Sequence, residues 1–300
     1  MKKIAKTLLY LFLSTVLIVA AVYSDINSFS AGSMLGSLFA GIVIPYLLQS
    51  IVDLTDNTNW KSTQRKLNRA GILQKDSTVR ISFAYLFRIK VDGKYFLVQN
   101  SRTHKYQPVG GAYKFKKAEA DYFCKHIPVE NDDRIPADKI TEYDYRLLVK
   151  NKDLRKFVRR FNRTIHRENV SNLSREFIEE VFNTGILDKK VFGALSYEYC
   201  GRHMTEVAYS SVFCCYELLL ADIVEVKLSE EQVQLFRELM KTTSENYHFA
   251  DAAEIRTLGV KYGTNVLTDK IANHTPKILS ENTERLIMRK MYQDRIVIDL

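Results

Sequence analysis

Two long apolar runs at the amino terminus constrain the fold of this chain more than any other feature. Residues 7–23 and 33–52 contain no charged side chain, and each approaches the ~20 residues that a membrane-spanning helix needs. A cleaved signal peptide is the alternative for the first run, because Lys2 and Lys3 precede it. No clear cleavage site follows, however, and a second run arrives after a short loop. We therefore predict a transmembrane hairpin over residues 1–54, with spans at 7–23 and 33–52.

The charges beside these runs predict how the hairpin is oriented. Three lysines precede the first span and four basic residues follow the second: Lys2, Lys3 and Lys6, then Lys61, Arg65, Lys66 and Arg69. The connecting loop, residues 24–31, carries only Asp25. Basic residues concentrate on the cytoplasmic side of membranes, so both termini should be cytoplasmic in a multi-pass protein of the cell membrane. The second basic cluster also predicts contact with anionic membrane lipid.

Small residues recur along the second apolar run. They form two ladders at four-residue spacing: Gly32, Gly36 and Ala40, and beside them Ser33, Ser37 and Gly41. Such ladders let helix backbones approach closely in lipid. The contact would lie either within the hairpin or between copies. We expect a homo-oligomer formed through the transmembrane helices.

The rest of the chain is patterned as a mixed α+β domain. We interpret residues 55–70 as a juxtamembrane linker and residues 71–300 as a cytoplasmic domain. Residues 79–91 and 94–99 alternate in polarity around Asp92-Gly93, which predicts a β-hairpin. A second hairpin is expected around Gly201-Arg202-His203. The four cysteines and six histidines of the chain show no spacing typical of metal ligands.

The segment Arg175-Glu176-Phe177-Ile178-Glu179-Glu180 carries the clearest chemistry. On a helix, its three glutamates share one face, and three adjacent carboxylates call for a cation such as Mg²⁺ or Mn²⁺. With Pro108-Val109-Gly110-Gly111 upstream, the segment resembles the box of the Nudix family. The resemblance implies a mixed-sheet α/β/α sandwich. It also implies that Glu176, Glu179 and Glu180 bind metal and act in catalysis, that Arg175 braces their helix, and that Gly110 and Gly111 contact a nucleotide.

In the Nudix family about a dozen residues separate the two halves of this box, whereas here residues 112–174 form an insertion between them. Glu119 and Glu168 are the candidates for the family's loop glutamate. Within the insertion, residues 143–167 predict one basic helical stretch. Its Arg155, Arg159 and Arg163 lie four residues apart, and arginine suits phosphate oxygens. They are candidate nucleotide-binding residues, and a solvated basic face is the alternative.

Two membrane helices ahead of a split Nudix box resemble the SMODS-associated Nudix proteins. That resemblance implies an effector of a bacterial antiphage (CBASS) system, located in the inner membrane. The Nudix-like domain would sense a cyclic oligonucleotide, the hairpin would disrupt the membrane, and duplex nucleic acid is not an expected partner. The alternative is a membrane-tethered Nudix hydrolase that cleaves nucleoside diphosphate derivatives with a divalent metal.

Overall fold

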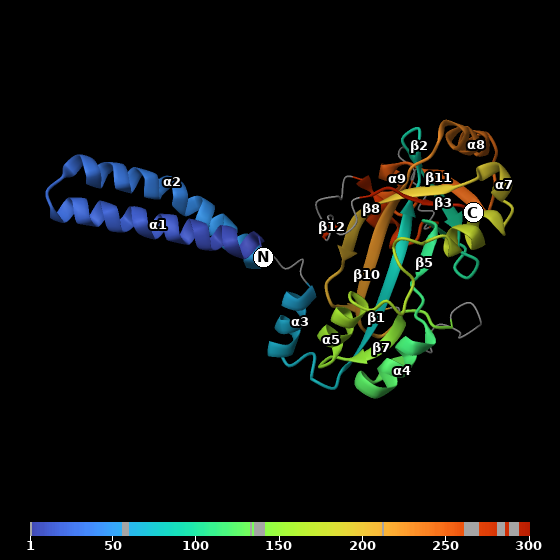
Figure 1. Cartoon of the computed structure of the whole chain (residues 1–300), viewed down its shortest axis with the longest axis horizontal. Coiled ribbons are helices and arrows are strands. Elements are labelled where there is room, and N and C mark those ends of the chain that lie inside the picture. The colour runs from blue at the N-terminus through green and yellow to red at the C-terminus, as the bar shows by residue number, and fades with distance from the viewer. Residues whose placement is uncertain are drawn as a thin grey trace. The chain divides into compact units, whose positions relative to one another are not determined.

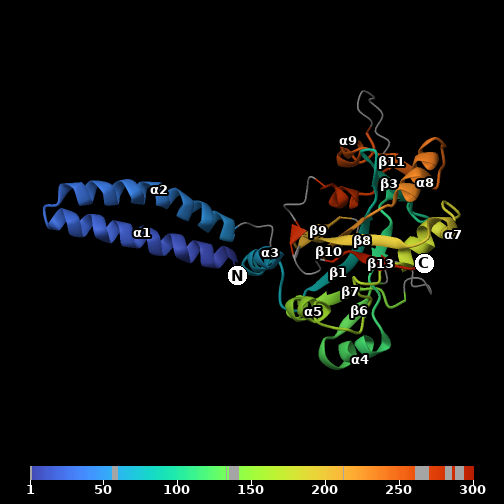
Figure 2. The same cartoon turned by 45° about the horizontal axis from the view of Figure 1, so that its top comes forward.

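The computed structural model of the chain (Figures 1 and 2) describes residues 2–55, 60–132, 134, 142–211, 213–260, 270–280, 286–287 and 294–300. The chain divides into two compact units, Met1–Ser62 and Thr63–Leu300. The first unit consists mainly of two apolar helices, and the second is a mixed α+β domain, as the sequence predicts.

The helices are α1 (Lys2–Ile26), α2 (Ser30–Thr55), α3 (Trp60–Arg69), α4 (Lys117–His126), α5 (Leu154–Phe161), α6 (Arg175–Phe177), the π-turn η1 (Ile178–Phe182), α7 (Lys189–Phe192), α8 (Glu230–Met240), α9 (Ala252–Arg256) and the 3₁₀ turn η2 (Thr275–Ile278). The strands are β1 (Thr78–Arg88), β2 (Lys90–Val91), β3 (Lys94–Gln99), β4 (Tyr106–Gln107), β5 (Gly110–Ala112), β6 (Val129–Asn131), β7 (Arg146–Lys150), β8 (Leu195–Met204), β9 (Ala208–Ser210), β10 (Cys215–Val226), β11 (Tyr247–Ala250), β12 (Leu286–Ile287) and β13 (Ile296–Ile298).

Helices α1 and α2 pair along a seam of alternating three- and four-residue spacing, the pattern of helices that wind around each other. The seam residues are Thr7, Tyr10, Ser14, Leu17 and Ala21 on α1, and Gly36, Ala40, Val43, Leu47 and Ser50 on α2. A Cβ added to Gly36 would lie 2.8 Å from the Cβ of Ala21, so this glycine permits the close approach. By length and composition, both helices could cross a membrane.

The hairpin uses only one of the two small-residue ladders. Gly36 and Ala40 are buried in the seam, whereas Ser37 and Gly41 are exposed and a Cβ on Gly41 would meet no neighbour. The first ladder therefore closes the hairpin itself. Association between copies stays a prediction, and the exposed ladder is where we would place it.

The large sheet of the second unit has the strand order β12-β8-β10-β1-β7-β6, with β5, β9 and β13 paired beside this path. Its central pair, β1 and β10, is parallel, and the neighbours of that pair are antiparallel. A smaller sheet has the order β11-β3-β2, with β4 beside β3. The predicted turn at Asp92-Gly93 is confirmed by the β2–β3 pairing of Lys90 with Tyr95. The rest of the predicted first strand, β1, pairs instead with β10, β7 and β5 of the large sheet.

Successive β1 side chains point to opposite faces of the large sheet, and the two faces differ in bulk. Large apolar residues (Ile81, Phe83, Tyr85, Phe87) occupy one face, which we call the aromatic face, where Phe83 stacks on Phe161 of α5 and Phe87 contacts Phe177 of α6. Smaller residues (Ser82, Ala84, Leu86) occupy the other, the hollow face. There Leu86 joins an apolar cluster with residues of the smaller sheet and of the segment 270–280. The domain is thus a sandwich in which the smaller sheet covers part of the hollow face.

The structure corrects two predictions of secondary structure. Residues 143–167 do not form one helical stretch, because residues 146–150 form β7, which pairs with the central strand β1. The insertion therefore extends the main sheet. The turn predicted at Gly201-Arg202-His203 is also wrong, since these residues lie inside β8. Strands β8 and β10 still pair as a hairpin, with Met204 opposite Leu220.

Candidate functional site

The carboxylate segment forms one short helix with an irregular turn. It begins as α6 and passes into the π-turn η1, in which the amide of Asn183 donates to the carbonyl oxygen of Ile178, five residues earlier, at 2.9 Å. Phe177 and Val181 are fully buried on the aromatic face. The π-turn is a known mark of functional sites, where it adds a residue within a helix.

The two halves of the interrupted box meet in space. The amide of Gly110 donates to Oε2 of Glu180 at 2.9 Å, and a Cβ on Gly111 would overlap the carboxylate of Glu176. Gly110 has φ +146°, a conformation that favours glycine, and a Cβ there would overlap the carbonyl oxygen of Tyr85. These glycines form a backbone wall against which the carboxylates pack.

Arg175 holds the acidic groups together. Its guanidinium lies 2.7 Å from Glu168, 2.6 Å from Glu176 and 3.5 Å from Glu179, and it donates to the carbonyl oxygen of Ala112 at 2.9 Å. The predicted brace therefore exists as a network that spans both ends of the insertion. Glu168 belongs to the site.

Glu119 does not belong to this network. It is fully buried and pairs with Arg160 at 2.6 Å, and it also accepts a hydrogen bond from Thr164. Of the two candidate loop glutamates, only Glu168 reaches the carboxylate helix.

The three glutamates have different environments. Burial, then the charge of Glu176, raises the pKa of Glu180 to about 8, although Gly110 and Gln107 donate to its oxygens. Burial also raises the pKa of Glu176, whereas the side chain of Glu179 is 41% exposed. Within the described part of the chain, no three acidic, histidine or cysteine side chains converge to hold a metal ion. The carboxylates instead interact with the guanidinium of Arg175 and the amide of Gly110. Binding of Mg²⁺ or Mn²⁺ therefore stays a prediction.

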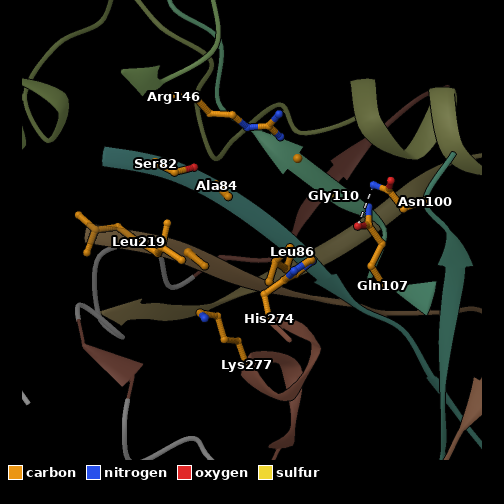
Figure 3. Close-up of a pocket in the computed structure, with 13 residues that line it drawn as sticks. Ser82, Ala84, Leu86, Asn100, Gln107, Gly110, Arg146, Leu219, His274 and Lys277 are labelled. Carbon is orange, nitrogen blue, oxygen red and sulfur yellow. Dashed lines mark hydrogen bonds between the residues drawn. The ribbon is translucent and has the colours of Figure 1, made fainter. Parts of the chain in front are cut away.

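A cavity of about 210 Å³ opens on the hollow face (Figure 3). It exists because β1 places small side chains there, and the paired strands add Leu219, Ala221, Arg146 and Gly110 at matching positions. The 13 described residues that line it are Ser82, Ala84, Leu86, Asn100, Gln107, Gly110, Gly111, Arg146, Leu219, Leu220, Ala221, His274 and Lys277. The glycine wall is common to the cavity and the carboxylate cluster.

The charged groups among these 13 described residues are cationic, and none of the 13 carries a carboxylate. His274 and Lys277 approach from the η2 segment and Arg146 from β7 on the other side of the cavity (Figure 3). Burial lowers the pKa of Lys277, and burial followed by the charges of Lys277 and Arg146 lowers that of His274 to about 4. Among the described residues, no carboxylate lies within ion-pair distance of Lys277. The charge of Glu217 offsets the lowered pKa of Lys277 only in part, and a partly buried lysine outside an ion pair suits an anionic ligand.

Comparison with known families identifies the second unit. The model of the SMODS-associated NUDIX domain matches residues 78–279, two thirds of the chain. The chain belongs to this family. No curated protein matches it.

In this SMODS-associated Nudix domain, the arginines predicted to bind nucleotide lie away from the cavity. Arg155 donates to Gln64 of α3 at 2.8 Å, and Arg159 and Arg163 are exposed. None of the three is among the described residues that line the cavity. The basic residues at the cavity, Arg146 and Lys277, were missed because nothing in their local sequence marks them. The alternation of large and small residues along β1 was the available signal for a hollow on one face.

Proposed function

We propose that this protein is the membrane-bound effector of a CBASS-type antiphage system. Its Nudix domain binds a cyclic oligonucleotide, and its apolar hairpin carries the response into the bacterial inner membrane, with both termini in the cytoplasm. The observation that carries the proposal is the cavity on the hollow face, in which Arg146, His274 and Lys277 converge with no carboxylate among the described lining residues. Membership of the SMODS-associated Nudix family supports the link to nucleotide signalling.

The chemistry of the cavity suits one nucleotide unit of a larger ligand. Lysine and arginine provide charged donors for a phosphodiester, while Asn100 and Gln107 offer amides, already joined to each other at 3.1 Å (Figure 3). The volume of about 210 Å³ lies below the roughly 300–1,000 Å³ typical of pockets that enclose a whole small molecule. The remainder of a cyclic oligonucleotide would therefore extend outside the cavity.

The carboxylate site favours binding over cleavage. Glu176 and Glu180 lie behind the glycine wall, and Arg175 already pairs with Glu168, Glu176 and Glu179. A cyclic oligonucleotide also lacks the diphosphate bond that Nudix enzymes cleave. The sensor would thus retain the Nudix fold without catalysing hydrolysis.

A membrane-tethered Nudix hydrolase is the second candidate. The observation in its favour is the assembly of the split box, with Gly110 bonded to Glu180 across the insertion. In that case the glutamates would bind Mg²⁺ or Mn²⁺, which would polarise a diphosphate substrate.

One experiment separates the two functions. The full-length protein in detergent is tested for binding of cyclic di- and trinucleotides by calorimetry, and for hydrolysis of nucleoside diphosphate sugars with Mg²⁺. We expect at least one cyclic nucleotide to bind, with only trace hydrolysis. Turnover of a diphosphate substrate that is lost in Glu179→Gln, without cyclic nucleotide binding, would establish the hydrolase instead.

A further inference from the structure

Helix α3 is cationic and, from Thr63 onward, is part of the second unit, although it falls within the range predicted as a linker. It contains no acidic residue, and its Arg65, Lys66 and Arg69 are exposed. On its inner side Gln64 is buried and donates to Asn151 at 2.7 Å. The orientation of its basic side is therefore set by packing.

Helix α5 lies against α3 and adds to the same charge. Arg155 of α5 donates to Gln64 at 2.8 Å, and both views place the two helices side by side (Figures 1 and 2). Burial and the nearby charge of Arg65 lower the pKa of Arg155, so the basic groups of the two helices are close.

The outer side of α5 is exposed and basic. Apolar residues anchor its inner side: Leu154, Phe157, Val158 and Phe161 are buried. Arg159, one turn beyond Arg155, is exposed, and α5 itself contains no acidic residue. Arg65, Lys66 and Arg69 of α3 with Arg159 of α5 form what we call the α3–α5 basic face.

Chain connectivity limits how far this face can be from a membrane. Helix α2 ends at Thr55 and α3 begins at Trp60. The five Cα-to-Cα steps between them can extend to at most ~18 Å. If α2 spans the bilayer, α3 starts no more than ~18 Å from the end of that helix, which is close enough for its basic residues to reach the headgroup region and the field of anionic lipid, which acts over about 8 Å.

We propose that the α3–α5 basic face binds the anionic headgroups of the membrane and thereby fixes the orientation of the Nudix domain on the bilayer. This proposal rests on the membrane location in the proposed function. It reassigns the predicted nucleotide-binding arginines of α5, because Arg155 contacts α3 and Arg159 faces solvent beside it. Lipid phosphate is the ligand chosen, since no residue of this face lines the cavity on the hollow face, where we place the nucleotide.

The test uses the full-length protein in nanodiscs made of phosphatidylcholine alone or with 30% phosphatidylglycerol. Hydrogen–deuterium exchange is followed in peptides covering α3 and α5. We expect slower exchange in the anionic discs, an effect that 0.5 M NaCl removes. Each basic residue near an anionic surface contributes about fivefold, so Arg65→Glu with Arg159→Glu should reduce the lipid-dependent protection roughly 10- to 30-fold.

The matched control is Lys189→Glu with Lys190→Glu on α7, whose side chains are exposed and whose reversal changes the net charge equally. The control should keep the lipid-dependent protection. Equal exchange in the two kinds of disc, or equal loss in both double variants, would overturn the proposal. Protein that is retained in discs yet shows no lipid dependence contradicts only the basic face. Protein that does not enter discs contradicts the proposed membrane function as well.

Discussion

Lys277 gives the sharpest test of the cavity, because removing its charge should strengthen the fold and weaken the function. Lys277→Met keeps the apolar stem and deletes the ammonium group. Burial lowers the pKa of Lys277 below its ordinary value of 10.5, which means that the folded protein disfavours the charged form. Destabilisation is therefore present while the lysine is protonated and disappears as pH rises through the lowered pKa.

The expected sizes follow from the environment of this side chain. Lys277 is only partly buried and the charge of Glu217 acts on it, so its desolvation should cost about 1 kcal/mol, the low end of the range for a buried unpaired group. A change of about 1 kcal/mol corresponds to roughly 2–4 °C in Tm for a domain of this size. A charged hydrogen bond to a phosphate is worth about 1.5–3 kcal/mol, so the Kd for a cyclic nucleotide should rise roughly 10- to 150-fold.

Thermal unfolding and calorimetry of the full-length protein in detergent measure both effects. The gain in Tm should be clear at pH 7 and shrink towards pH 10. The matched control is Lys152→Met, because Lys152 is 53% exposed and paired with Asp76 at the surface; both its Tm and its Kd should stay close to wild type. A Lys277→Met protein that melts lower than wild type, yet binds nucleotide with unchanged affinity, would refute the reasoning.

Three further outcomes are expected. Gly111→Ala should lower stability by about 1–3 kcal/mol, because its Cβ overlaps the carboxylate of Glu176; a urea midpoint equal to that of the wild type would contradict this. Since Glu180 has a folded pKa of about 8 against 4.5, stability should fall by about 4 kcal/mol between pH 5 and 9, and Glu180→Gln should flatten the curve. Gly36→Ile should separate α1 from α2 in spin-label distance measurements, whereas Ser37→Ile, on the exposed side, should not.

The sequence was sufficient where the signal is local. Uncharged runs of sufficient length predicted the two apolar helices, and the carboxylate spacing with the glycine pair predicted the Nudix frame although residues 112–174 interrupt it. Each of these predictions depends on residues a few positions apart in the chain. The geometry of a helix or strand determines how such residues lie relative to one another. The hydrogen bond between Gly110 and Glu180 shows that the insertion separates the two halves of the box in the sequence, whereas the fold brings them into contact.

Long-range pairing decided what the sequence could not predict. Residues 146–150 lie in a basic stretch that suits a helix, but pairing with β1 makes them a strand and directs Arg146 toward the cavity. His274 and Lys277 arrive from a segment remote in sequence and tied to Tyr106, whose carbonyl oxygen accepts from Ala272 at 2.9 Å. Because the residues of this pocket come from segments far apart in the sequence, no characteristic spacing between them marks the pocket.

The π-turn within the carboxylate segment has a consequence for how this chain could change. A residue in an α-helix accounts for about 100° of rotation, and the wider π-turn absorbs one additional residue without passing that rotation on to the segment that follows. Deleting one residue between Ile178 and Phe182 would therefore restore regular helix geometry and leave the segment beyond the turn in place. The deletion would remove one position from the carboxylate helix, while the core contacts beyond it could be kept. The turn is thus a place where the chain could change its length by one residue within a secondary-structure element.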